Sequence, residues 1–227
     1  MARRRLLTRE ALARHLDPSV DEREITRNFT LGQDDFDLIA TRRGDASRLG
    51  FAMVMLYMRW PGRVLEERET PPAPILAFVA RQLDLSPGIW QHYARRDETR
   101  RSHLATLMRR HGYRAFDRAA FQDLTLFAMP IAQNVTQPSR LAVILIDEMR
   151  RRKILLPSVT VIEALVRRAR QQADQLVQDV LSGDLTPDTR SRLDRILERR
   201  SERSASWLSW LRNPPLSPAS RNVLRLL

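Results

Sequence analysis

Residues 75–96 read ILAFVARQLDLSPGIWQHYARR, and this stretch decides which helical fold we expect. Its first half places apolar residues at helical spacing. Its second half is short and ends at Arg95 and Arg96. We therefore predict an amphipathic helix, a tight turn at Asp84-Leu85-Ser86, and a second short helix. This outline is typical of the helix-turn-helix.

The residue types within the stretch support that prediction. Asp84 stands where such turns usually have glycine, and aspartate is among the residues that tolerate a left-handed backbone. Ser86 is a suitable N-cap, and Pro87 suits the first helical position. The apolar residues expected to pack the two helices together, with Ala80 as the small residue at their approach, are Val79, Leu83, Leu85, Trp90 and Tyr93.

The polar side chains of the second helix suggest a binding role. Gln91 could read adenine in the major groove, with His92 beside it, while Arg95 and Arg96 could reach phosphates. The alternative is an ordinary helical hairpin with a solvated polar face. The formal net charge of +12 favours double-stranded DNA as the partner.

Composition narrows the function classes further. Of the 39 basic residues, Lys153 is the one lysine, which GC-rich coding would explain, yet arginine also suits phosphate and guanine. Cysteine is absent, which excludes disulfides, thiolate metal sites and thiol nucleophiles, and we expect no metal and no cofactor. We see no membrane-spanning run, no signal peptide at Met1–Arg5, and no one-sided basic pattern suited to a lipid surface. A soluble, cytoplasmic protein is therefore expected.

Helical periodicity extends over almost the whole chain, so we predict an all-α fold of tandem small helical bundles with helix-turn-helix motifs, followed by a helical linker domain. The segments 66–74 and 154–157 are expected domain boundaries, giving a first DNA-binding domain at 1–65, a second at 66–156 and the linker domain at 157–227. The expected helices are 6–16, 21–28, one capped by Thr30 and ending near 42, 46–60, 97–111, 116–132, 139–152, 158–181, one starting at 186–187, 206–212 and one after 217.

Two further groups of arginines are candidate phosphate contacts. Arg42, Arg43 and Arg48 flank the helix break at Gly44, where a helix N-terminus could face phosphate. Arg100 and Arg101 lie on the basic helix 97–111 and could follow the DNA backbone, or could pair with nearby acids.

Other chemistry-bearing residues favour structural roles. Asp34-Asp35 and Asp147-Glu148 are neighbours on predicted helices, where adjacent side chains point about 100° apart, so we do not expect catalytic carboxylate pairs. The four histidines share no metal-ligand spacing, and apart from His92 we expect surface positions for them. Trp207 and Trp210 are expected to pack the last domain.

Several blocks of sequence together resemble the N-terminal region of the Tn-three family of replicative transposases. These blocks are RRGD at 42–45, RLGF at 48–51, LY at 56–57, RWPGR at 59–63, ARRDETRR at 94–101, RRKILLP at 151–157 and the tail from Trp210 to Leu224. In that family, N-terminal domains bind the terminal inverted repeats of the transposon, and a separate C-terminal domain with a DDE carboxylate triad cuts and joins DNA.

The resemblance implies a bacterial, nucleoid-associated chain that recognises terminal inverted repeats, carries no DDE residue and is not itself an enzyme. It also leaves room for a homodimer formed outside this chain or at its end. An α-helical interaction scaffold and a stand-alone helix-turn-helix repressor are the alternatives.

Overall fold

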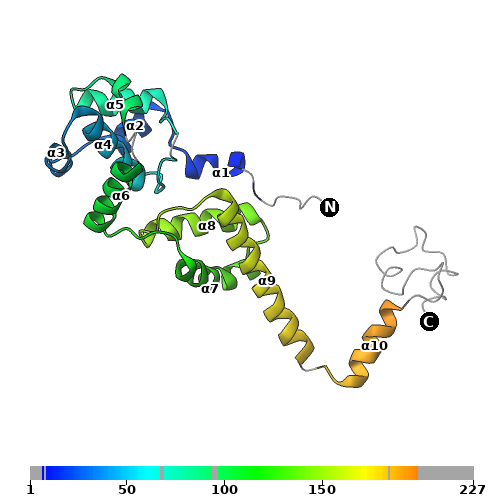
Figure 1. Ribbon diagram of the computed structural model, residues 1–227. Helices are drawn as coiled ribbons and strands as arrows, with labels where there is room; N and C mark the ends of the chain where they lie inside the picture. Colours follow the sequence, from blue (N-terminus) through cyan, green and yellow to red (C-terminus); the bar gives the residue numbers. More distant parts are fainter. Residues whose placement is uncertain (1–6, 8, 67–68, 94–96, 184, 199–227) are drawn as a thin grey trace, which may run out of the picture. The chain divides into compact units, whose positions relative to one another are not determined.

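The computed structural model describes residues 7, 9–66, 69–93, 97–183 and 185–198. It confirms the predicted all-α class: over these residues the chain forms helices, with one isolated parallel bridge between Arg114 and Ile154. The helices are α1 Arg9–Leu16, α2 Glu22–Phe29, α3 Gln33–Ala40, α4 Asp45–Arg59, α5 Ala73–Gln82, the 3-10 helix η1 Pro87–His92, α6 Asp97–His111, α7 Arg118–Asn134, α8 Pro138–Arg151, α9 Val159–Gly183 and α10 Pro187–Leu197 (Figure 1).

Some helix starts follow the signals expected from sequence, and others do not. The Asp21 carboxylate caps α2 by accepting from the Arg23 and Glu24 amides. Thr30 does not cap the third helix, because its hydroxyl is turned back to donate to the Thr26 carbonyl at 2.6 Å. Helix α3 instead begins after Gly32, whose amide donates to the Asp35 carboxylate.

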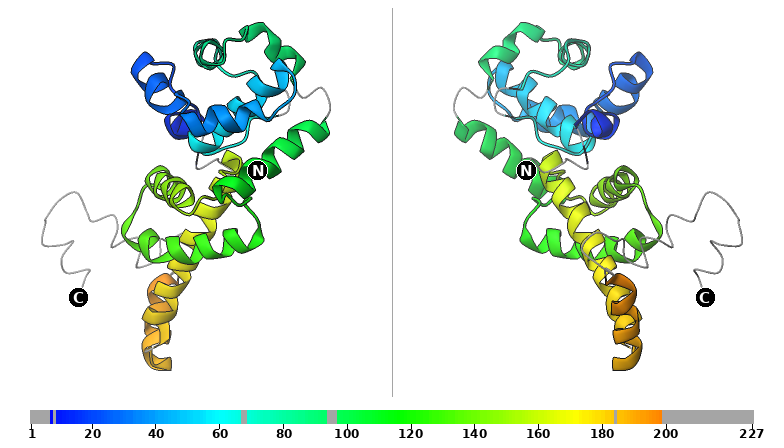
Figure 2. Two further views of the ribbon diagram at one scale, coloured as in Figure 1. Left: turned by 90° about the vertical axis from the view of Figure 1, so that its left-hand side faces the viewer. Right: turned by 90° about the vertical axis from the view of Figure 1, so that its right-hand side faces the viewer.

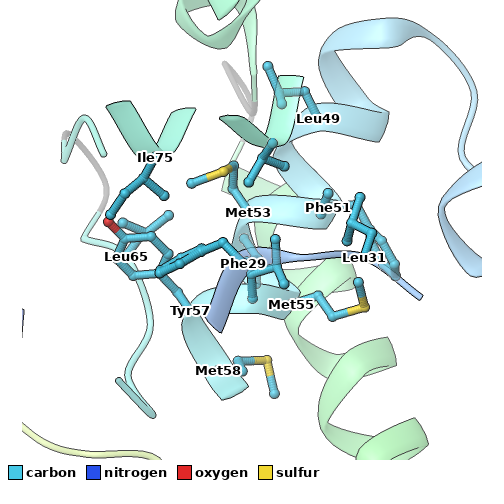
Figure 3. Packing of buried hydrophobic residues seen from close by; sticks show 14 of the residues in the cluster. Phe29, Leu31, Leu49, Phe51, Met53, Met55, Tyr57, Met58, Leu65 and Ile75 are labelled. Carbon is cyan, nitrogen blue, oxygen red and sulfur yellow. The ribbon is translucent and has the colours of Figure 1, made fainter. Parts of the chain in front are cut away.

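The first hydrophobic core surrounds α4. Every residue from Leu49 to Met58 is buried, so this helix is enclosed on all sides. Figure 3 shows its side chains packed among those of Phe29, Leu31, Leu65 and Ile75. Helices α2, α3, α5, η1 and α6 all contact α4. This core therefore contains residues from both sides of the 66–74 segment.

The second core is built from amphipathic helices. Leu12 and Leu16 of α1 pack with the buried faces of α7, α8 and α9. Although α1 comes first in the chain, it contacts α8. Figure 2 shows the helices of both cores from two sides. The expected boundaries at 65/66 and 156/157 stay predictions.

Two arginines connect these cores. The Arg150 guanidinium donates to the carbonyls of Pro61, at 2.8 Å, and His15, and it lies 4.3 Å from the centre of the Trp60 ring. The Arg63 guanidinium donates to the Leu16 carbonyl at 2.9 Å. Both side chains thus satisfy backbone carbonyls where the two cores meet.

The chain divides into two compact units, residues 1–173 and 174–227. In the second unit, Thr186 caps α10 by accepting from the Thr189 amide, as the sequence predicted for a helix starting at Thr186-Pro187. Trp207 and Trp210 lie outside the described residues. Over the part of the chain that the structure describes, no helix has the length and apolar character needed to cross a membrane.

Candidate nucleic-acid interface

The turn between α5 and η1 has the backbone geometry that the sequence predicted. Asp84 adopts a left-handed conformation with φ of 54°. The amides of Leu83 and Leu85 both donate to the Ala80 carbonyl, at 3.1 and 2.9 Å, and close the end of α5. An aspartate at this position can therefore replace the usual glycine.

The second element of the pair is a 3-10 helix rather than an α-helix. The Ile89 amide donates to the Ser86 carbonyl, and the Tyr93 amide donates to the Trp90 carbonyl, each three residues back. Six residues give few α-type hydrogen bonds, and a segment this short can form the tighter helix instead. Ser86 precedes it without forming the expected side-chain cap.

Helix η1 divides its side chains between the core and solvent. Ile89 and Trp90 are half-buried and pack against the first core. Gln91 and His92, the side chains expected near bases, are exposed, and so is Ser86, a further candidate for DNA contact.

Because residue 50 of α4 is a glycine and has no side chain, Tyr93 can pack directly against this helix. If Gly50 carried a Cβ, that atom would lie 1.9 Å from Cδ2 of the Tyr93 ring. Gly50 therefore fixes where η1 ends on the surface of α4. No role was predicted for Gly50 from the sequence, although a glycine inside a long apolar helix is the kind of signal that marks close packing.

Three side chains then connect η1, α6 and α4. The Tyr93 hydroxyl lies 3.1 Å from Nδ1 of His103, and Nε2 of His103 lies 3.4 Å from Oγ of Ser47. His103 is 5% exposed, so the expected surface position is wrong. Its spacing from Leu104 and Leu107 places it on the buried side of α6, where it meets α4.

Burial also controls the protonation of this histidine. Desolvation, with a smaller contribution from the positive charge of Arg42, lowers the pKa of His103 to about 4. The imidazole is therefore neutral at pH 7 and has one donor and one acceptor nitrogen for its two neighbours. Burial likewise raises the pKa of Tyr93 to about 12.

The same cluster reaches the turn between α3 and α4. The Phe51 ring meets His103 edge-on at 5.0 Å, and the Arg42 guanidinium lies 4.9 Å from the centre of the Phe51 ring. Arg48 donates through Nε to the Arg42 carbonyl at 3.1 Å. Arg43 and Arg48 are exposed. Arg42 is thus connected through the Phe51 ring to His103 of α6.

The remaining candidate arginines differ in their environments. Arg100 donates to the Leu65 carbonyl, so part of its guanidinium has a structural role. Arg101 is exposed. Arg95 and Arg96 lie outside the described residues. A hollow of about 410 Å³ beside η1 is lined by Arg100 and Gln91 but also by Glu66 and Glu69, so its charge is mixed.

Of the carboxylates considered as catalytic pairs, Asp35, Asp147 and Glu148 form ion pairs with arginines, and Asp34 is exposed. Burial would raise the pKa of Asp35, but a two-bond pair with Arg59 and the Gly32 amide hold it below its usual value. Hydrogen bonds from Arg151 and Arg152 lower the pKa of Glu148 to about 2. Asp147 pairs with Arg150. Among the described residues, no group of three or more histidine, aspartate or glutamate side chains could hold a metal ion.

Comparison with known proteins identifies the class of this all-α chain. It belongs to the family described as a domain of unknown function (DUF4158), whose model matches residues 6–169. It is 34% identical to the transposase for transposon Tn21 from Escherichia coli over 227 residues, 99% of the chain and 23% of that protein.

Two further transposases show the same level of similarity. Identity is 34% over 201 residues to those for transposon Tn3926 from Escherichia coli and transposon Tn501 from Pseudomonas aeruginosa. Each match covers 88% of the chain and 20% of the relative. The chain thus spans about a fifth of the length of these relatives, and the predicted resemblance to transposases is confirmed.

Proposed function

We propose that this chain binds double-stranded DNA in a sequence-specific way and recognises the terminal inverted repeats of a transposon, as the non-catalytic N-terminal part of a transposase. The observation that carries the proposal is the 34% identity to proteins that act as transposases, over 88–99% of the chain. The net charge of +12 is consistent with a nucleic-acid partner.

Within this proposal, the exposed residues near η1 have different tasks. Ser86, Gln91 and His92 contact base edges, because they leave the core on the accessible side of η1. The arginines contact phosphates: Arg42, Arg43, Arg48, Arg95, Arg96, Arg100 and Arg101. Because η1 is only six residues long, it can contact only a short part of a groove. The neighbouring arginines must therefore supply much of the affinity for DNA.

The proposal assigns no catalytic role to the acidic residues discussed above. Asp35 and Glu148 are held in ion pairs with arginines, and Asp147 pairs with Arg150. Carboxylates that bind two metal ions for strand transfer must instead converge on a shared, open position.

Selection from a random-sequence duplex pool, followed by fluorescence anisotropy at several salt concentrations, tests the proposal. We expect one enriched motif and an affinity that falls steeply with salt, since each phosphate contact contributes about −0.9 to the slope of log K against log salt. Enrichment of no motif, together with binding that does not change with salt, would reject the proposal and favour a protein-interaction scaffold.

Two substitutions separate base contacts from phosphate contacts. Gln91→Ala should relax the preference at one position of the selected motif, whereas Arg96→Ala should weaken binding to all duplexes and reduce the salt slope by about 1. Arg23→Ala on α2 is a control that removes the same charge from an exposed position outside the proposed interface. Equal weakening on selected and random duplexes by both test variants contradicts the division of tasks.

A further inference from the structure

A second surface, formed by α7 and α9, has features that the interface near η1 does not explain. A hollow of about 480 Å³ lies between these helices. Its lining includes two arginines and two glutamines, Arg118 and Gln122 from α7 and Arg168 and Gln172 from α9. Phe121 and Leu126 complete one side, and Leu126 is 63% exposed, a high value for a leucine.

The two arginines of this hollow differ from their neighbours. Many cations of the second core have a partner: Arg150, Arg151, Arg152 and Arg167 form ion pairs, while Lys153 and Arg170 donate to backbone carbonyls. Arg118 and Arg168 are exposed and form no ion pair with any acid in the described part of the chain. The nearest acid in sequence, Asp117, uses its carboxylate to cap α7 at the Ala120 amide.

The charge of the surrounding segment has the same sign. Residues 112–173 contain ten Lys and Arg but five Asp and Glu, whereas residues 17–41 contain two arginines and seven acids. Two unpaired guanidinium groups at one hollow, in a segment with excess positive charge, suit a ligand with repeated negative charges. The glutamine amides can donate hydrogen bonds to phosphate oxygens or base edges.

We propose that the hollow between α7 and α9 is a second contact site for the backbone of duplex DNA, in which Arg118 and Arg168 each bind a phosphate. This inference rests on the proposed function and extends it to the second core. The contact lies in the same compact unit as the η1 interface. The proposal requires that a bound duplex extends from one core to the other.

The test uses the double variant Arg118→Gln/Arg168→Gln in the full chain with the selected duplex. We expect the salt slope to fall by about 2 and the affinity at about 0.15 M salt to fall at least about tenfold, since two phosphate contacts are lost. Hydroxyl-radical footprinting should show protection lost at one end of the site and retained at the other. The matched control is Arg140→Gln, an exposed arginine of α8 outside the hollow.

Further measurements separate the possible failures. Absence of binding by the unmodified chain overturns the proposed function itself. Unchanged slope and footprint in the double variant, with normal unfolding of that variant, overturn only the second site. Arg118→Lys/Arg168→Lys keeps both charges and should restore most of the slope. Loss of poly-glutamate binding in the glutamine variant, with DNA binding intact, would instead identify an acidic-peptide site and overturn the proposal.

Discussion

The two cores of the first unit use charge and burial in different ways. The first core surrounds a single helix, α4, and places polar groups such as His103 and Asp35 inside the packing. The second core joins amphipathic helices and also buries the carboxylates of Glu148 and Glu163, but these pair with arginines only three or four positions away in the chain. Substitutions in the first core should therefore disturb fold and interface together, whereas charges on the second can be changed separately.

The largest expected effect concerns the pH dependence of the first core. Because burial lowers the pKa of His103 from 6.5 to about 4, the folded state binds fewer protons than the unfolded state between these values. The contribution of His103 is complete above pH 6.5 and is lost as the pH falls towards 4, by up to about 3 kcal/mol. Urea unfolding at several pH values measures it.

His103→Gln keeps polar atoms near Tyr93 but cannot titrate, so its stability should change less with pH in this window. His92→Gln is the control, because His92 is exposed. If the two variants show equal pH dependence, His103 does not carry the effect, and the contrast between the cores loses its main support.

A smaller effect is expected at the contact between α4 and η1. Gly50→Ala places a methyl group within 2 Å of the Tyr93 ring, so η1 must move, at a cost of about 2 kcal/mol. The midpoint temperature of thermal unfolding and the affinity for duplex DNA should both fall. Gly183→Ala is the matched control, since a Cβ there meets no atom within 4 Å.

A second substitution checks the cause. In a double-mutant cycle, Tyr93→Ala removes the ring that the new methyl group would strike, so adding Gly50→Ala to it should cost little. Additive costs in the cycle would show that Tyr93 is not the residue that requires glycine at position 50.

The smallest effect concerns the ion pairs of Glu148 in the second core. Hydrogen bonds from Arg151 and Arg152 lower the pKa of Glu148 from 4.5 to about 2, so its contribution is present above pH 4.5 and lost as the pH falls towards 2. Because the Arg151 side chain is 71% exposed, solvent weakens the pairing, and Glu148→Gln should cost about 1 kcal/mol at pH 7. DNA binding should be unchanged. A loss comparable to that of Gly50→Ala would erase the difference between the cores.

The features that could be predicted from the sequence are those that depend on neighbouring residues alone. Helix α6, the start of α10 and the left-handed Asp84 follow from periodicity, capping and backbone preference. The 3-10 form of η1 could not be separated from a short α-helix by pattern alone, because both have similar spacing over six residues. Thr30 lies before α3, but its hydroxyl donates to the Thr26 carbonyl of the preceding helix and does not cap the following one.

The parts of the candidate interface that could not be predicted from the sequence depend on contacts between distant residues. Ser47 and His103 are 56 positions apart, and the contact of Gly50 with Tyr93 joins α4 to the end of η1. The periodicity of the sequence does not show that His103, on the basic helix α6, will pack against α4. The exposure of Gln91 and His92 was predictable, since it depends only on which residues pack.

The order of packing also has a consequence for synthesis on the ribosome. Helix α1 leaves the exit tunnel before the other described helices, yet it contacts α8, which begins at Pro138. The residues of the first core, Ile25 to Leu107 with Leu155, are almost all made in between. Since chains emerge from the N-terminus at about 5–20 residues per second, the apolar face of α1 waits several seconds for its partner. Nascent chains stalled before α8 should therefore present Leu12 and Leu16 to chaperones while the first core is already largely assembled.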